Sequence, residues 1–246
     1  MRYPFVLLDA GETLFGPRES FGAVYSRVLA PMGLVRSAEV FESAIRESWR
    51  EMDREVPPGT DRYAFFDGGE DGYWLRFARG AIDRAAGAPM PCGFAESALA
   101  PLREAFRDPA AWHVFPDVRP ALSEIRHAGG RLAVVSNWDS RLPYLLEVLD
   151  LDDLFDAVAG SHMLGVEKPN PRIFRSAIEA LGADPRLTLH VGDLPETDLD
   201  GARSTGIDGV LVDRRCRLTP GPGVIADFEP LPRIVRDGLP SAALRT

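Results

Sequence analysis

The sequence predicts an α/β fold in which a doubly wound parallel sheet carries an inserted helical domain. Short apolar runs alternate with helical patterns in the second half of the chain, as parallel strands joined by crossover helices require. Residues 17–109 show helical spacing and no strand pattern. Three of the apolar runs end abruptly in polar groups. Together these observations predict a sheet with a polar crevice at one edge and a second, helical domain.

The first apolar run, residues 5–8, has no polar face and ends at Asp9, which predicts a buried strand. Further on, apolar side chains at helical spacing predict helices, whereas residues 53–71 are polar, rich in Pro and Gly, and predict a loop. The predicted helices are 20–32, 40–52, 73–86 and 94–106. We therefore expect a helical domain at 17–109 and a sheet domain formed by 1–16 and 110–246.

The second half of the chain predicts a Rossmann-like sheet. Apolar runs predict strands at 131–135, 155–160, 187–191 and 209–213. Helical patterns separate them at 120–129, 142–149, 171–181 and 198–205. Parallel neighbours covered on both faces read as continuous apolar runs of this kind. The carboxyl ends of such strands share one edge, where ligands bind.

Composition excludes several classes of function. The chain has 246 residues, a formal net charge of -9 and a pI near 5.0, which disfavours nucleic acid or a membrane surface as partner because both are polyanionic. Its two cysteines, Cys92 and Cys216, lie far apart and predict neither a disulfide framework nor a zinc site. With no run of about 18 apolar residues, we expect a cytoplasmic protein that acts on a small molecule.

Basic residues are used in an unusual way. Of the 28 basic residues, all but Lys168 are arginine. Ammonium is a compact point charge that fits a tight oxyanion site, whereas guanidinium is a wide planar fork. The single lysine is therefore a candidate functional residue, and chance retention is the alternative.

Polar groups at the strand ends are expected to converge. Asp9, Ser136 and the pair Asp193 and Asp198 follow three strands, and Lys168 lies in a fourth loop. Carboxylates that share a crevice repel one another unless a cation joins them, and hard oxygen ligands suit Mg²⁺. An ammonium and a hydroxyl nearby can hold an anion such as phosphate. An aspartate beside that anion can attack it in line. The pattern indicates a Mg²⁺-assisted phosphoryl site.

Four segments in this order resemble the motifs of the haloacid dehalogenase-like hydrolase superfamily. They are Asp9-Ala10-Gly11-Glu12-Thr13-Leu14, Val135-Ser136-Asn137, Lys168-Pro169 and Gly192-Asp193-Leu194-Pro195-Glu196-Thr197-Asp198. The helical insertion resembles the helical-cap branch of that superfamily. The resemblance covers nearly the whole chain and implies a hydrolase with a small phosphorylated substrate and a Mg²⁺ cofactor.

The resemblance implies roles for particular residues. Asp9 would be the nucleophile and a Mg²⁺ ligand, with the backbone carbonyl of Gly11 and the carboxylate of Asp193 completing the metal site. Asp198 would support that site or orient Lys168. The phosphoryl group would be bound by a set drawn from two motifs and from the loop after Asp9, namely Ser136, the backbone of Asn137, Lys168 and Gly11.

The sequence departs from the family pattern after the nucleophile. Phosphatases of the family carry an acid/base Asp two residues after it, and here that position is Gly11. Such proton transfer contributes about 10² to 10⁴ in rate, so we expect slow or leaving-group-restricted phosphatase activity. Glu12, at a position where the family usually has Gly, is one candidate to supply the missing carboxyl. A solvent-facing or capping role is the alternative.

Two other functions stay open. A chain that kept the fold could serve as a binding or regulatory protein with little or no turnover. A haloacid dehalogenase needs neither a proton donor nor a metal, but the retained pair Asp193 and Asp198 argues against it. Loss of Mg²⁺-dependent turnover in Asp9→Asn would exclude the binding protein.

Overall fold

The structure is a computed structural model that describes residues 1–219, 221 and 223–239. The described residues form two compact units, one from 1–16 and the described part of 114–246, the other from 17–113. The predicted boundary at 109/110 thus lies four residues before the division in the structure, and the end of the predicted sheet domain, 240–246, lies outside the described residues. No helix in the described part of the chain is long and apolar enough to cross a bilayer.

The first unit is built on a six-stranded parallel sheet of order β5-β4-β1-β6-β7-β8. Its strands are Phe5–Leu8 (β1), Arg131–Ser136 (β4), Ala157–Gly160 (β5), Thr188–Gly192 (β6), Asp208–Val212 (β7) and Val224–Ile225 (β8). The chain adds strands first on one side of β1 and then on the other. The predicted α/β class is confirmed, and at the reversal of strand order beside β1 such sheets bind ligands at their carboxyl edge.

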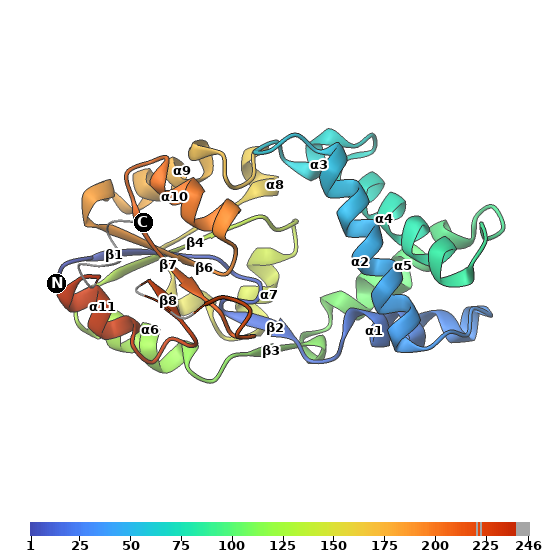
Figure 1. Cartoon of the computed structure of the whole chain (residues 1–246), viewed down its shortest axis with the longest axis horizontal. Helices are drawn as coiled ribbons and strands as arrows, with labels where there is room; N and C mark the ends of the chain where they lie inside the picture. Colours follow the sequence, from blue (N-terminus) through green and yellow to red (C-terminus); the bar gives the residue numbers. More distant parts are fainter. Residues whose placement is uncertain (220, 222, 240–246) are drawn as a thin grey trace. The chain divides into compact units, whose positions relative to one another are not determined.

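Helices cover both faces of the sheet (Figure 1). One face carries Pro171–Leu181 (α9) and Asp200–Arg203 (α10), and the other carries Val118–His127 (α6) and Leu231–Asp237 (α11). The short helices Leu142–Val148 (α7) and Ser161–Leu164 (α8) follow β4 and β5. Because both faces are covered, Val6, Leu7 and Leu8 of β1 are completely buried, as their continuous apolar run predicts.

The second unit consists of helices around an aromatic core. Its main helices are Phe21–Leu29 (α1), Ala38–Glu55 (α2), Gly69–Ala86 (α4) and Phe94–Arg107 (α5). Their inward faces supply Tyr25, Phe41, Tyr73 and Phe77 to one core cluster. These helices match the predicted ones, because amphipathic spacing is a local signal that burial on one face then stabilises.

The predicted loop at 53–71 is wrong in part. Helix α2 continues to Glu55 and stops there because Val56 precedes Pro57 and takes extended geometry, with φ -84° and ψ 121°. A further turn of helix, Arg62–Phe65 (α3), begins at Asp61, whose carboxylate accepts from the backbone N–H of Ala64. Tertiary packing and capping thus order a segment that composition assigns to a loop.

Short strands join the two units. Phe15–Pro17 (β2) pairs with Trp112–Val114 (β3) in a separate two-stranded sheet. The sequence did not predict either strand, because three residues are too few to show alternation. This pairing carries the chain out of the first unit and back, and it explains why the unit boundary falls at 113/114 rather than at 109/110.

Alkaline pH is expected to destabilise the first unit through Tyr3. The Tyr3 hydroxyl donates to Asp208 Oδ2 at 2.6 Å, and burial together with Asp208 raises the pKa of the phenol to about 12. An unfolded tyrosine titrates near about 10. The contribution of Tyr3 to stability is therefore present below about pH 10 and is lost as pH rises toward 12.

Urea unfolding measured from about pH 9 to about pH 11.5, a range that spans the ordinary tyrosine pKa near 10, checks this expectation. The free energy of unfolding should fall more steeply with pH in the wild-type chain than in Tyr3→Phe. The single lysine and the other tyrosines are the same in both proteins, so the difference between the two slopes reports on Tyr3. Identical slopes would contradict the assignment.

Candidate active site

The predicted polar groups meet at the carboxyl edge of the sheet. Asp9 follows β1, and Ser136 is the last residue of β4. The Lys168 ammonium donates to Asp9 Oδ1 at 2.5 Å and to Asp198 Oδ1 at 2.7 Å. The Ser136 hydroxyl donates to the same Asp9 oxygen at 2.8 Å. All four side chains are at least nine-tenths buried, so they form one connected polar cluster.

Asn137 holds the lysine loop in place through its side chain. Its Nδ2 donates to the backbone oxygen of Lys168 at 3.0 Å, and its Oδ1 accepts from the backbone N–H of Lys168 at 2.6 Å. The resemblance implies that the backbone of Asn137 binds the phosphoryl group. In the structure its side chain also binds the backbone of Lys168. This two-point contact aligns the loop that carries the ammonium with the end of β4.

Asp198 is enclosed by hydrogen bonds. It lies in the π-helical turn Pro195–Leu199, where its Oδ1 also contacts His190 Nε2 at 2.8 Å and its Oδ2 accepts from the backbone N–H of Leu194 at 3.1 Å. A Cβ on Gly192 would lie 2.2 Å from the carboxylate carbon of Asp198, so only glycine allows this approach. With both oxygens engaged, Asp198 is suited to orient Lys168.

Three carboxylates form a cluster that fits a divalent cation. One oxygen each of Asp9, Asp193 and Asp198 lies within 4.8 Å of the others, and all three residues are buried. The lone ammonium of Lys168 offsets at most one of these charges. All the donors are hard oxygens, which is the ligand chemistry that Mg²⁺ prefers. The residues present therefore fit the metal that the sequence predicts.

The pKa values follow from this crowding. Burial, reinforced by the Asp9 and Asp198 charges, raises the pKa of Asp193 to about 7. Burial is also the main cause that raises the pKa of Asp9, and Lys168 opposes it. Although burial works against both ions, Lys168 lowers the pKa of Asp198, and Asp198 together with Asp9 raises the pKa of the Lys168 ammonium. The Lys168 to Asp198 contact is thus a stable ion pair. For Asp9 and Asp193, burial raises the pKa by more than the nearby Lys168 and Arg217 lower it.

Glu12 has a partner of its own. Its backbone lies in the left-handed region with φ 58°, a conformation that favours glycine. Its carboxylate accepts from Arg215 Nη2 at 2.7 Å, and no hydrogen bond links it to Asp9 among the described residues. The structure therefore gives Glu12 an ion-pairing role on the rim. Its role as substitute proton donor stays a prediction without structural support.

Sequence reasoning missed the arginine loop after β7. Arg217 Nη2 donates to Asp193 Oδ2 at 3.3 Å, and Arg214 donates to the backbone oxygen of Thr13 and to Asp117. With Arg215 on Glu12, this loop contacts both the loop after β1 and the acidic cluster. The signal was present, because three arginines directly follow a strand end in an acidic chain. Arginine is abundant throughout this chain, so its position after a strand is a weak indicator of function.

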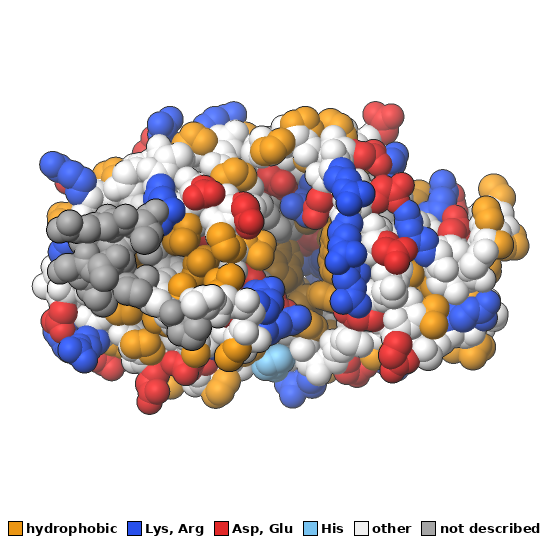
Figure 2. All heavy atoms as spheres, viewed as in Figure 1, with side chains coloured by type: hydrophobic (Ala, Val, Ile, Leu, Met, Phe, Trp, Pro, Cys, Tyr) orange, Lys and Arg blue, Asp and Glu red, His pale blue; other side chains and the backbone are white. Residues whose placement is uncertain are grey.

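The helical unit carries a basic row of its own. Arg46, Arg50 and Arg54 are exposed at successive four-residue steps of α2, and none of them forms an ion pair with a described residue. Figure 2 shows basic side chains in a column over this helix. The same helix carries six acidic residues, so the row of arginines does not give α2 a net positive charge.

A doubly wound sheet that places buried carboxylates at its carboxyl edge is compatible with a hydrolase, and the comparisons with known proteins agree. A family model for haloacid dehalogenase-like (HAD) hydrolases matches residues 6–206. The chain belongs to this family, and the resemblance found in the sequence is confirmed.

Known relatives include phosphatases. Haloacid dehalogenase-like hydrolase domain-containing protein 3 of Mus musculus is 31% identical over 236 residues, covering 94% of this chain and 85% of that protein. A phosphoserine phosphatase of Thermus thermophilus is 33% identical over 176 residues, covering 71% of this chain and 66% of that protein. The structure of the putative HAD-hydrolase YfnB from Bacillus subtilis, bound to magnesium, has the same fold. Its TM-score is 0.73 at 17% identity, over 96% of this chain and 99% of that one.

Proposed function

We propose that the protein is a Mg²⁺-dependent phosphatase that hydrolyses a small phosphate monoester through an aspartyl-phosphate on Asp9. The observation that carries the proposal is the buried Asp9 carboxylate, held by Lys168 and Ser136 beside a second and a third carboxylate. Membership of a hydrolase family with phosphatase relatives supports it.

Each residue has a task in this reaction. A carboxylate oxygen of Asp9 attacks phosphorus while the bond from phosphorus to the leaving oxygen breaks. The Lys168 ammonium and the Ser136 hydroxyl both reach Asp9 Oδ1, so they can also bind the oxygens of a phosphoryl group placed next to it. Water then attacks phosphorus and releases phosphate, which restores the Asp9 carboxylate.

A Mg²⁺ ion would be held by Asp9 and Asp193, with Asp198 in support, and would neutralise charge on the phosphoryl oxygens. The crowded carboxylates would then lose their mutual repulsion. Gly11 offers no side chain for proton transfer, so turnover is expected to be slow for leaving groups that need a proton.

The test is a phosphate-ester panel assayed with Mg²⁺ and with EDTA. We expect release of phosphate that depends on Mg²⁺ and falls by at least about 100-fold on chelation, as the loss of metal charge stabilisation implies. Acid quenching of a turnover reaction should trap labelled phosphate on the chain. Absence of turnover across the panel would reject the proposal and favour a binding or regulatory protein.

Metal binding is expected to depend on pH. The pKa of Asp193, about 7 without metal, lies above that of an unfolded aspartate, so the metal-free chain loses stability as pH rises toward 7. Mg²⁺ must displace the proton from Asp193, and it binds more tightly when the proton has already left.

Thermal unfolding with Mg²⁺ or EDTA at about pH 6 and about pH 8, roughly one unit below and above the pKa of Asp193, measures this effect. The stabilisation by Mg²⁺ should be larger at pH 8. The matched control is Asp200→Asn, because Asp200 lies two residues after Asp198, is exposed and belongs to a different ion pair. This control should keep the wild-type response, whereas Asp193→Asn should lose it. Equal stabilisation at both pH values would contradict the assignment.

A further inference from the structure

The indole of Trp138 occupies the space that a side chain at position 11 would need. A Cβ built on Gly11 would lie 2.6 Å from Cζ3 of Trp138, with two further ring carbons at 3.5 and 3.6 Å. Gly11 is not among the glycines with positive φ, so its backbone itself would accept another residue. The obstacle is therefore the ring, and any side chain at position 11 requires the ring to move.

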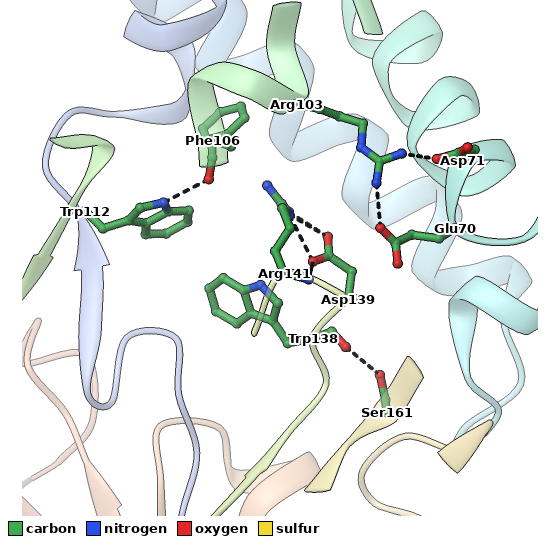
Figure 3. A network of polar contacts seen from close by, with 9 residues as sticks. All are labelled: Glu70, Asp71, Arg103, Phe106, Trp112, Trp138, Asp139, Arg141 and Ser161. Atoms are coloured by element: carbon green, nitrogen blue, oxygen red, sulfur yellow. Dashed lines mark hydrogen bonds and ion pairs between the residues drawn. The ribbon is translucent and has the colours of Figure 1, made fainter. Parts of the chain in front are cut away.

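The Trp138 ring is packed against its neighbours beside the loop that follows Asp9. It packs against the fully buried ring of Phe15, with centroids 5.2 Å apart. The backbone oxygen of Trp138 accepts from the Ser161 hydroxyl at 3.3 Å, and the next residue, the buried Asp139, binds Arg141 Nη2 at 2.6 Å (Figure 3). Phe15 thus contacts the ring itself, and the two polar contacts hold the backbone from which the ring projects.

The ring contacts the loop that follows Asp9, because it lies against position 11, two residues after Asp9. Along the chain, Trp138 follows Ser136, whose hydroxyl contacts Asp9, by two residues. Trp138 is only partly buried, so part of it remains exposed. Where a carboxyl group could have donated a proton, the site presents aromatic carbon, which donates none and packs well against another aromatic ring.

We propose that Trp138 is a specificity-determining residue that excludes an acid at position 11 and selects phosphate monoesters with an aryl leaving group. The inference rests on the proposed phosphatase function. As the bond from Asp9 to phosphorus forms, the aryl oxygen departs with the electron pair of its bond as a phenolate, which takes a proton from water afterwards. No protein proton is needed for this step, and the departing ring lies against the indole.

A stability cycle tests the steric part without any activity measurement. Gly11→Ala should lower the melting temperature by several degrees in the wild-type chain and by clearly less in a Trp138→Ala background, because the second change opens the space. Equal losses in both backgrounds would overturn the claim that the ring excludes a side chain.

Kinetics test the substrate class, with p-nitrophenyl phosphate and ethyl phosphate as probes. Wild type should prefer the aryl ester by at least about 100-fold in kcat/KM, in line with the usual contribution of a general acid. Trp138→Ala should raise KM for the aryl ester and leave that for ethyl phosphate unchanged. The double variant Gly11→Asp/Trp138→Ala should gain at least about tenfold on ethyl phosphate, whereas Gly11→Asp alone should not.

The outcomes separate the inference from the function on which it rests. Mg²⁺-dependent turnover in which Trp138→Ala changes both esters equally, or in which Gly11→Asp alone gains on ethyl phosphate, overturns the role of Trp138 and leaves the phosphatase intact. No turnover of either ester by any variant overturns the proposed function and the substrate class with it. The stability cycle then still decides whether the ring excludes the side chain.

Discussion

Asp9→Asn is expected to lower kcat for Mg²⁺-dependent hydrolysis of p-nitrophenyl phosphate by at least about 10³-fold, as loss of a covalent nucleophile does in other hydrolases. Asparagine has nearly the same size and keeps a polar group near Lys168 and Ser136, but its amide does not attack phosphorus. The change also removes one of the three carboxylates in the cluster. No labelled phosphate should remain on the quenched variant.

The fold should survive this change. Burial raises the pKa of Asp9, so the charged carboxylate lowers the stability of the metal-free chain. A neutral amide does not carry this desolvation penalty. We expect the melting temperature of Asp9→Asn in EDTA to equal or exceed that of the wild type. The control Asp200→Asn makes the same chemical change on an exposed side chain and should retain full activity. Activity in Asp9→Asn above a tenth of the wild-type rate would reject Asp9 as nucleophile.

Lys168→Met is expected to damage both stability and catalysis. The Lys168 side chain is 3% exposed, and its ammonium contacts two buried carboxylates, at 2.5 and 2.7 Å. Removing one partner of a buried ion pair costs about 3–5 kcal/mol, because the remaining charges stay buried without compensation. The free energy of unfolding in EDTA should fall by that amount at about pH 7.5, well above the pKa of an unfolded aspartate near 4.

The deficit should depend on conditions in a defined direction. Without the ammonium, the pKa values of Asp9 and Asp198 rise in the folded chain, so the lost stability returns as pH falls toward that of an unfolded aspartate, about 4. Mg²⁺ should restore part of it at neutral pH. Chemical unfolding at pH 5.5 and 7.5 (about two units apart), with and without Mg²⁺, measures both effects. A deficit that neither acid nor Mg²⁺ reduces would contradict the electrostatic explanation.

Lys168→Arg is the matched variant for catalysis. It keeps a positive charge but replaces a compact ammonium with a wide, planar guanidinium, which does not fit between two carboxylate oxygens. We expect turnover to remain at least about 100-fold below wild type, since oxyanion contacts of this kind carry about that much. Near wild-type turnover would show that charge alone matters at this position.

Much of the fold could be predicted because its signals are local. The apolar run before Asp9 predicts a buried strand, and the structure places it at the centre of the sheet with Val6, Leu7 and Leu8 fully buried. The helices of the inserted unit follow from spacing alone. The short strands β2 and β3 and the turn of helix α3 could not be predicted, because pairing and capping by distant groups decide them.

The sequence by itself determined which chemical groups stand at the strand ends: a nucleophile candidate at Asp9, the single lysine, and the acidic pair Asp193 and Asp198. Order along the chain and strand direction sufficed, because parallel strands deliver their carboxyl ends to one edge. Only the tertiary structure decided what each group contacts. Asp198 is committed to Lys168 and His190, and Asp193 also meets an arginine from the last loop.

The same division applies to the departure from the family pattern. The sequence showed that Gly11 and Glu12 stand where the family usually has Asp and Gly, but it could not show what surrounds them. The structure shows both surroundings. The indole of Trp138 fills the space beside Gly11, and Arg215 binds the carboxylate of Glu12. Both depend on residues more than a hundred positions away, and contacts at such separations are set by how the sheet assembles.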